Sequence, residues 1–194
     1  MSGGRAVFLD RDGVLVEDVD ALLLADQIHL LPGAAEGTRR LHAAGFALVM
    51  VTNQPIVARG MATEADVERL NGEIAERLAA AGGARLDAAY SCPHHPHADV
   101  PDYRVECDCR KPRPGLLTRA AAERGYDLAR SYMVGDRPTD VLAGQRAGCR
   151  TVQVLSGRHA DPPIVTSDAH PADVRPDHVA AGLREAAEWI AAQG

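Results

Sequence analysis

Short apolar runs alternate with longer segments of helical periodicity along the chain. The runs that predict strands are rich in apolar and β-branched residues and span residues 5–9, 46–51, 86–90, 131–134, 151–155 and 177–180. The segments that predict helices span residues 32–44, 63–81, 114–124, 138–147 and 183–192. Alternating strands and helices are typical of βαβ units. We therefore expect an α/β fold with a doubly wound, mostly parallel sheet that has helices on both faces and the last strand at an edge.

Residues that favour helix ends flank several of these segments. Thr63 precedes a helical segment with acids in its first turn, as an N-cap residue does. Gly45, Gly125 and Gly148 each follow a helical segment directly, where a left-handed residue commonly ends a helix. These signals support the predicted boundaries.

Two long polar segments interrupt the alternation. Residues 91–113 are rich in Cys, His and Pro, and residues 156–175 are rich in His, Pro and Asp. Long loops without regular structure are uncommon in a compact domain and are usually functional. Both segments therefore need a chemical explanation.

The composition limits the classes of protein that this chain can represent. Its 194 residues, 46% hydrophobic and 25% charged, predict one globular domain over residues 1–194. The net charge of −6 and the pI of about 5.7 argue against a nucleic-acid binder with a broad basic face. Neither a membrane span of roughly 18 apolar residues nor a signal peptide is expected. We expect a cytoplasmic monomer that binds neither nucleic acid nor membrane.

The basic residues contain one exception. Lys111 is the only lysine among the 21 basic residues, and the rest are arginines. Chance retention of one lysine is the simplest explanation. The alternative is that this position requires a compact ammonium charge, which a planar guanidinium cannot replace.

Polar residues gather where the predicted strands end. In doubly wound sheets the ligand binds beyond the carboxyl ends of the strands. The residues at these ends, and in the loop before the third helix, include acids, a threonine and the lysine: Asp10, Asp12, Thr52, Lys111, Asp136 and Asp140. We expect these side chains to form one site.

Crowded carboxylates of this kind favour a bound cation. Two carboxylates about 4 Å apart repel by roughly 4 kcal/mol at an effective dielectric near 20. Oxygen ligands favour Mg²⁺, which leaves coordination positions for a substrate phosphate. Lysine and threonine suit the other phosphate oxygens, and a neighbouring Asp can act as a covalent nucleophile. Each motif alone is typical of a turn or a helix cap, but their combination favours phosphoryl transfer.

Four motifs then resemble those of the haloacid dehalogenase (HAD) phosphatases. They are Phe-Leu-Asp-Arg-Asp-Gly at 8–13, Val-Thr-Asn-Gln at 51–54, Arg-Lys-Pro at 110–112 and Val-Gly-Asp-Arg-Pro-Thr-Asp at 134–140. The Asp-Arg-Asp-Gly form and Cys-Asp-Cys-Arg-Lys-Pro at 107–112 resemble the subgroup of heptose 1,7-bisphosphate and histidinol-phosphate phosphatases. The resemblance covers about residues 6–155 and implies a Rossmann-like HAD fold, without a large cap domain.

The resemblance implies roles for the catalytic residues. Asp10 would attack phosphorus and form an aspartyl phosphate, and Asp12 would protonate the leaving alkoxide and later deprotonate water. Thr52 would bind a phosphoryl oxygen. Lys111 lies at the family's lysine position and would neutralise charge on nucleophile and phosphate.

The resemblance also implies the ligands of a catalytic Mg²⁺. These are the carboxylates of Asp10 and Asp136 and the backbone carbonyl of Asp12. Asp140 is a further acid that could support the metal.

The loop at 91–113 predicts a second metal site. Cys92, a nearby histidine, Cys107 and Cys109 form two close pairs of soft or borderline ligands, a pattern typical of a structural Zn²⁺ site. Unpaired cytosolic thiols are the alternative, and disulfides are disfavoured in the expected compartment.

The spacing of the loop does not decide which histidine binds zinc. His94, His95 and His97 all fit, and the family resemblance favours His94. Cys149 lies at an apolar helix–strand junction and is expected in the core.

Residues around the site are candidates for substrate binding. Arg59 and Arg110 could bind a second phosphate, and Asn53 and Gln54 could reach substrate hydroxyls. Two segments depart from the pattern of the heptose enzymes: Pro55-Ile56 follows the second motif, and residues 14–29 lack the expected Tyr-Val.

The resemblance implies a Mg²⁺-dependent phosphatase of a small phosphorylated metabolite. The favoured reaction removes the C7 phosphate of heptose 1,7-bisphosphate in nucleotide-heptose synthesis. Histidinol phosphate is the alternative substrate, because Glu17, Asp18 and Asp20 could bind its amine. A non-catalytic zinc-loop binding module is a hypothesis of another class, which loss of Asp10 or Lys111 would have supported.

Overall fold

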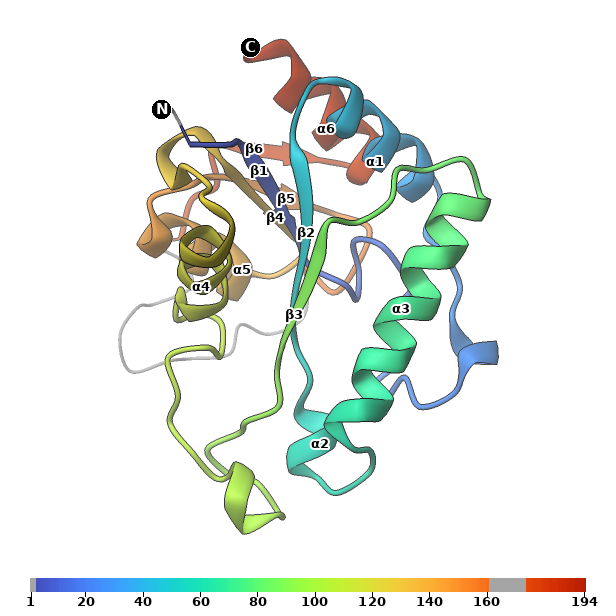
Figure 1. The fold of residues 1–194 in the computed structure, drawn as a ribbon, viewed down its shortest axis with the longest axis vertical. Helices are drawn as coiled ribbons and strands as arrows, with labels where there is room; N and C mark the ends of the chain where they lie inside the picture. Colours follow the sequence, from blue (N-terminus) through green and yellow to red (C-terminus); the bar gives the residue numbers. More distant parts are fainter. Residues whose placement is uncertain (1–2, 161–173) are drawn as a thin grey trace.

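A single parallel sheet forms the centre of the molecule. The computed structural model describes residues 3–160 and 174–194. The sheet has the strand order β3-β2-β1-β4-β5-β6, and every neighbouring pair is parallel (Figure 1). Its strands are β1 Ala6–Leu9, β2 Ala47–Asn53, β3 Ala88–Cys92, β4 Tyr132–Gly135, β5 Arg150–Val154 and β6 His178–Ala180. The predicted α/β class, the parallel sheet and the edge position of the last strand are confirmed.

Helices connect the strands and cover both faces of the sheet. They are α1 Ala34–Ala43, α2 Pro55–Ala58, α3 Glu64–Ala80, α4 Gly115–Arg124, α5 Pro138–Ala147 and α6 Leu183–Ala192. Val7 and Leu9 of β1 pack into a core with residues of α1, α3 and α6, whereas Ala6 and Phe8 pack into a second core with residues of α4 and α5. Side chains alternate between the faces of a strand, so the apolar run of β1 fills both cores.

The main differences from the predicted elements lie near the second and third strands. β3 begins at Ala88, two residues later than predicted, and the Asp87 carboxylate accepts a 2.7 Å hydrogen bond from the Leu48 amide just before it. β2 continues to Asn53, two residues beyond its predicted end. Helix α2 was not predicted; it is short, and its Ile56 and Val57 pack against Val67 of α3.

The long polar segments have little regular structure. Residues 91–113 begin inside β3 and contain the short 3₁₀ turn Pro101–Tyr103. A second 3₁₀ turn, Ala25–Gln27, lies between β1 and α1. Within the described residues these insertions are loops rather than a cap domain. Much of the predicted loop at 156–175 lies outside the described residues.

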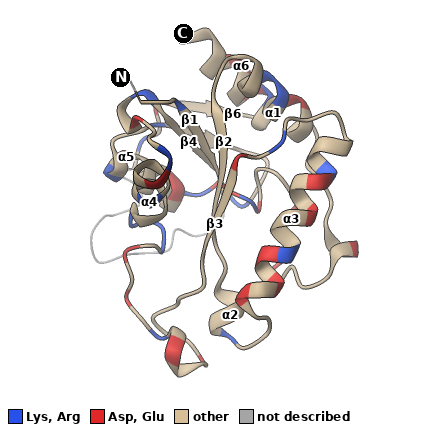
Figure 2. Cartoon of the chain, in the orientation of Figure 1, with Lys and Arg blue, Asp and Glu red and all other residues tan. Residues whose placement is uncertain are grey.

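Charged residues of both signs occur on the helices in the described part of the chain. Figure 2 shows acidic and basic positions mixed along α3. Its Glu68, Arg69 and Glu76 are exposed, while Leu70 and Ile74 face the core. None of the helices in the described ranges is long and apolar enough to cross a membrane.

Replacing Thr63 with Ala is expected to destabilise the fold by about 1 kcal/mol through loss of the α3 N-cap. The Thr63 hydroxyl accepts a 3.1 Å hydrogen bond from the Asp66 amide, and the Asp66 carboxylate accepts one of 3.0 Å from the Thr63 amide. The melting temperature should fall by roughly 2–4 °C. Thr63→Ser is the matched control and should melt like wild type; equal melting of all three proteins would contradict the capping role.

Candidate active site

The parallel order of the sheet brings the polar strand ends together. β1 lies between β2 and β4, so Asp10 after β1, Thr52 in β2 and Asp136 after β4 share one edge. The Asp10 amide donates a 3.0 Å hydrogen bond to the carbonyl of Val134, which continues the pairing of β1 with β4 past the last strand residue. The edge predicted from the sequence therefore exists as one site.

Lys111 lies buried at the centre of this site. Its Nζ is 2.9 Å from Asp10 Oδ1, 2.6 Å from Asp140 Oδ1 and 3.0 Å from the carbonyl oxygen of Val51. These acceptors match the donors of an ammonium group, which explains why a compact lysine suits this position. Burial acts to lower the pKa of Lys111, but the two carboxylates outweigh it and raise the pKa. The side chain thus remains charged.

Asn53 holds the backbone of Lys111 in place. Its Nδ2 donates to the Lys111 carbonyl, and its Oδ1 accepts from the Lys111 amide, both at 3.0 Å. The amide is therefore committed to the lysine loop. These contacts favour a positioning role for Asn53 over the substrate contact expected from the sequence.

Three carboxylates crowd together beside the lysine. Side-chain oxygens of Asp10, Asp136 and Asp140 lie within 4.8 Å of one another. Burial, followed by the charges of the other two acids, raises the pKa of Asp136 to about 8. Burial and the charge of Asp140 raise the pKa of Asp10 to about 6, although Lys111 opposes this. The cluster is strained by like charge, and a cation would relieve that strain.

Asp136 has one buried carboxylate oxygen that is available to bind a cation. Its Oδ2 accepts a 2.7 Å hydrogen bond from the Arg158 amide, whereas its buried Oδ1 has no hydrogen-bond partner among the described residues. A buried oxygen of this kind calls for an ion or another donor. The all-oxygen donor set fits a hard divalent cation such as Mg²⁺.

Asp140 has structural partners in addition to its place in the cluster. Its Oδ2 accepts a 3.0 Å hydrogen bond from the Arg137 amide at the start of α5, and its Oδ1 lies against Lys111. An added Cβ at Gly135 would collide with the Asp140 side chain, so this approach requires a glycine there. Asp140 therefore ties the lysine to α5.

Gly13 allows the chain to turn after Asp12. Its φ is +80°, in the left-handed region that glycine favours, and an added Cβ would lie 2.5 Å from Asp136 Oδ2. The chain therefore turns directly after Asp12.

Gln54 joins Asp12 to Thr52. Its Nε2 donates to Asp12 Oδ2 at 3.0 Å and to Thr52 Oγ1 at 2.8 Å, and the side chain is buried. Like Asn53, Gln54 has internal partners that favour positioning over direct contact with substrate. The Asp12 carboxylate lies outside the cluster around Asp136 and is bound by Arg11 instead.

The two candidate arginines lie near each other beside the site. Arg59 is exposed at the end of α2, and Arg110 precedes Lys111 and donates a 3.0 Å hydrogen bond to the carbonyl of His94. Burial lowers the pKa of Arg110, and the positive charge of Arg59 lowers it further. Their paired positive charges suit an anionic ligand.

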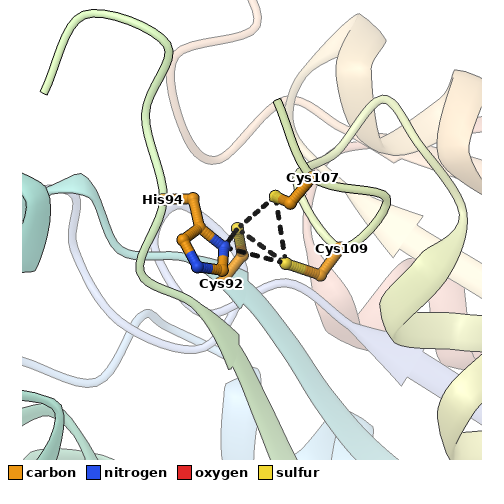
Figure 3. Close-up of side chains that lie close together, drawn as sticks. All are labelled: Cys92, His94, Cys107 and Cys109. Carbon is orange, nitrogen blue, oxygen red and sulfur yellow. Dashed lines mark hydrogen bonds between the residues drawn. The ribbon is translucent and has the colours of Figure 1, made fainter. Parts of the chain in front are cut away.

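A second cluster lies in the loop at 91–113, where the side chains of Cys92, His94, Cys107 and Cys109 converge (Figure 3). Cys109 Sγ is 3.2 Å from Cys92 Sγ and 3.1 Å from Cys107 Sγ, and His94 Nδ1 is 3.4 Å from Cys109 Sγ. The hydrogen bond with Cys92 contributes most to lowering the pKa of Cys109 to about 5. A thiolate among such ligands suits Zn²⁺.

The other histidines and the remaining cysteine lie apart from this cluster. His95 Nδ1 accepts a 3.1 Å hydrogen bond from the His97 amide, so His94 is the histidine that joins the cysteines. Cys149 lies in the core beneath α4 and α5, where burial raises its pKa to about 12. Its predicted core position is confirmed.

Comparison with known proteins identifies the family. A family model described as HAD-hydrolase-like matches residues 108–186. D-glycero-D-manno-heptose-1,7-bisphosphate 7-phosphatase from Thermosynechococcus vestitus is 39% identical over 188 residues, which cover 95% of this chain and 94% of that protein. The chain belongs to the heptose-1,7-bisphosphate 7-phosphatase family of HAD-like hydrolases.

Two further relatives support the assignment to this family of phosphatases. The D-glycero-beta-D-manno-heptose-1,7-bisphosphate 7-phosphatase of Escherichia coli K12 is 42% identical over 158 residues, covering 81% of this chain and 82% of that protein. The crystal structure of D,D-heptose 1,7-bisphosphate phosphatase from B. bronchiseptica, complexed with magnesium and phosphate, has a TM-score of 0.79 at 31% identity and covers 98% of this chain and 99% of that one.

Some residues at this phosphatase-family site were not anticipated from the sequence. The family resemblance implies no role for Arg11, although it lies within the motif at 8–13, and Asn71 lies on α3, far along the chain. Arg158 contacts Asp136 through its backbone amide, which no side-chain pattern reveals. Only the spacing of Arg11 between two acids could have signalled one of them.

Asp136→Asn is expected to stabilise the magnesium-free protein at pH 8 but not near pH 4. The folded-state pKa of about 8 lies above the ordinary value of 3.8, so the folded wild type binds more protons than the unfolded chain between these values. Stability contributed by this group is therefore present below about pH 4 and lost as pH rises toward 8. Asn carries no charge and avoids the loss.

Thermal melting in magnesium-free buffer at both pH values tests this. At pH 8 the variant should melt at least about 3 °C above wild type, as about 1 kcal/mol would produce. A pH-independent difference would show that the carboxylate is not strained by its neighbours.

Proposed function

We propose that this protein is a Mg²⁺-dependent phosphomonoester hydrolase that removes the 7-phosphate of D-glycero-D-manno-heptose 1,7-bisphosphate, in the biosynthesis of nucleotide-activated heptose. The observation that carries the proposal is the buried contact of Lys111 with Asp10 and Asp140 in a chain of this phosphatase family. A lysine in contact with an aspartate at the end of a central strand suits an aspartate nucleophile beside a dianionic phosphate.

Asp10 is assigned as the nucleophile. Its Oδ1 contacts Lys111 and accepts a 2.7 Å hydrogen bond from the Arg11 amide, so we assign the attack to Oδ2. The Lys111 ammonium would neutralise charge on the nucleophile and on the phosphate, and the Thr52 hydroxyl would bind an oxygen of the transferring phosphoryl group. Attack forms the bond from Oδ2 to phosphorus, while the bond from phosphorus to the sugar oxygen breaks.

Asp12 is assigned as the general acid and base. Its side chain is 23% exposed and can therefore meet the leaving oxygen. In the first step Asp12 gives its proton to the sugar oxygen, which keeps the electron pair of the broken bond. In the second step Asp12 takes a proton from water, whose oxygen attacks phosphorus and releases inorganic phosphate from Asp10.

The side chains of Asp10 and Asp136 would hold Mg²⁺ with the Asp12 backbone carbonyl, and Asp140 would support the site through Lys111. The unpartnered Asp136 Oδ1 supports this assignment. Bound Mg²⁺ supplies Lewis-acid stabilisation of the negative charge on the transferring phosphoryl group.

The charges around the site favour a bisphosphate over histidinol phosphate. Two of the three acids considered for an amine already have partners: Asp18 lies 3.2 Å from Arg137 and 3.1 Å from Arg158, and Asp20 also pairs with Arg158. Arg59 and Arg110 remain as the positive pair for a second phosphate. Asn53 and Gln54 would contribute to substrate binding mainly by holding Lys111, Asp12 and Thr52.

Zn²⁺ bound by Cys92, His94, Cys107 and Cys109 would order the loop at 91–113. Four protein ligands leave no open position, so this metal would be structural. Because Arg110 and Lys111 directly follow Cys109, the zinc would also position the catalytic lysine.

We further propose that residues 1–194 act as one phosphatase domain, a cytoplasmic monomer that binds its small substrate and no nucleic acid. The acidic balance of the chain and the charge mixing on α3 support the last point. A candidate site formed entirely by residues of one chain supports the monomer.

Comparing kcat/KM for heptose 1,7-bisphosphate and histidinol phosphate, with and without Mg²⁺, tests the proposal. The bisphosphate should be preferred by more than about a hundredfold, nearly 3 kcal/mol of transition-state binding. Asp10→Asn should abolish turnover, whereas the exposed Glu68→Gln on α3 should leave it unchanged. Similar rates on both substrates would refute the heptose assignment, and a folded but inactive wild type would favour a binding module.

Cys109→Ser is expected to lose zinc and, with it, order around Lys111. Metal analysis of wild type should find about one Zn²⁺ per chain, and the variant should contain much less and melt at lower temperature. Cys149→Ser, the control outside the cluster, should keep its zinc. Wild type that purifies without zinc and is not stabilised by added Zn²⁺ would contradict the site.

A further inference from the structure

Arg11 is buried, and its guanidinium group contacts both carboxylate oxygens of Asp12, the assigned general acid and base. Arg11 Nε lies 3.1 Å from Asp12 Oδ1 and 3.2 Å from Oδ2, and Nη2 lies 3.0 Å from Oδ2. The Arg11 side chain is 2% exposed, whereas that of Asp12 is 23% exposed. A buried guanidinium therefore holds a carboxylate that is partly open to solvent.

The guanidinium is in turn anchored from the other side of the site. Its Nη1 donates to Asn71 Oδ1 at 3.2 Å, and Asn71 Nδ2 donates to Ser91 Oγ at 3.1 Å. Asn71 is buried on α3, and Ser91 belongs to β3. A chain of hydrogen bonds thus links two elements far along the sequence to Asp12.

A buried guanidinium is costly unless its charge and its donors are satisfied. An apolar side chain of similar volume would fill this space without that cost. Instead, the Nε and Nη2 groups of Arg11 both contact the Asp12 carboxylate, and Gln54 Nε2 adds a third donor to the same carboxylate. Three N–H groups from two residues restrict the carboxylate to one orientation.

We propose that Arg11, anchored by Asn71, is a positioning residue that orients the Asp12 carboxyl group for proton transfer. The inference rests on the proposed function, because it assumes that Asp12 donates a proton to the leaving oxygen. As the bond from phosphorus to that oxygen breaks, the oxygen takes the electron pair and the Asp12 proton. The alcohol departs, and Asp12 becomes a carboxylate paired with Arg11.

Leaving groups that do and do not need this proton separate positioning from general structural support. A sugar alkoxide is a strong base and needs protonation, whereas p-nitrophenolate leaves without it. In a single turnover the leaving group is released before the Asp10 phosphate is hydrolysed. The rate of this release therefore reports the first step alone. We would measure this rate for heptose 1,7-bisphosphate and for p-nitrophenyl phosphate.

Arg11→Lys keeps the charge and removes the fork. We expect the rate of sugar release to fall by about tenfold or more, and the rate of p-nitrophenol release to stay within about twofold of wild type. The substrate concentration that gives half the maximal rate should not change. Asn71→Ala should show the same pattern with a smaller loss. Asn71 lines a cavity of about 460 Å³, where water can replace its amide, so this second variant should fold.

Gly72→Ala is the control on α3, because an added Cβ there has no atom within 4 Å. It should release both leaving groups at wild-type rates. Equal slowing of both substrates by Arg11→Lys and Asn71→Ala, or no slowing of either, would overturn the positioning role. A wild type that hydrolyses neither substrate would instead refute the proposed function.

Discussion

The contact of one buried ammonium group with two carboxylates is the interaction on which the candidate site depends. Lys111 Nζ lies between Asp10 and Asp140 and also donates to the Val51 carbonyl. Without it, three buried acids would share one small volume, and their repulsion would have to be relieved by protonation or by rearrangement. With it, one negative charge is balanced before a metal or substrate arrives. The remaining excess of negative charge is what a divalent cation would neutralise.

The rest of the structure can be understood as the means of placing this lysine. Asn53 holds its backbone from the end of β2, and Asp140 ties its side chain to α5. The Cys/His cluster ends at Cys109, two residues before it, in a loop with few apolar side chains of its own. A metal there would supply ordering energy that this loop cannot obtain from burial. The Cys/His cluster and the candidate active site are therefore coupled through the short stretch of chain from Cys109 to Lys111.

Charge pairing outside the catalytic centre also shapes what the site can accept. Asp18 and Asp20, in the segment after β1, pair with Arg137 and Arg158. Arg59, at the end of α2, lies close enough to Arg110 for its charge to lower the pKa of Arg110. Specificity between an amine and a phosphate at the far end of a substrate is a difference of free energies, and unpaired charge decides it. The sequence alone does not reveal these arginine partners, so from the sequence the acids could also bind the amine of histidinol phosphate.

The sequence by itself determined the fold class and most element boundaries. Apolar runs that fill both faces of a sheet, and capping residues such as Thr63 and Gly125, act locally and are legible in one dimension. It also predicted that the polar strand ends meet, because the carboxyl ends of parallel strands lie at the same edge of the sheet. Only the tertiary structure decided which histidine joins the cysteines, that Asn53 and Gln54 bind protein groups, and that Arg11 reaches Asn71 across sixty residues. These facts depend on distances between elements remote in the chain, and no periodicity encodes them.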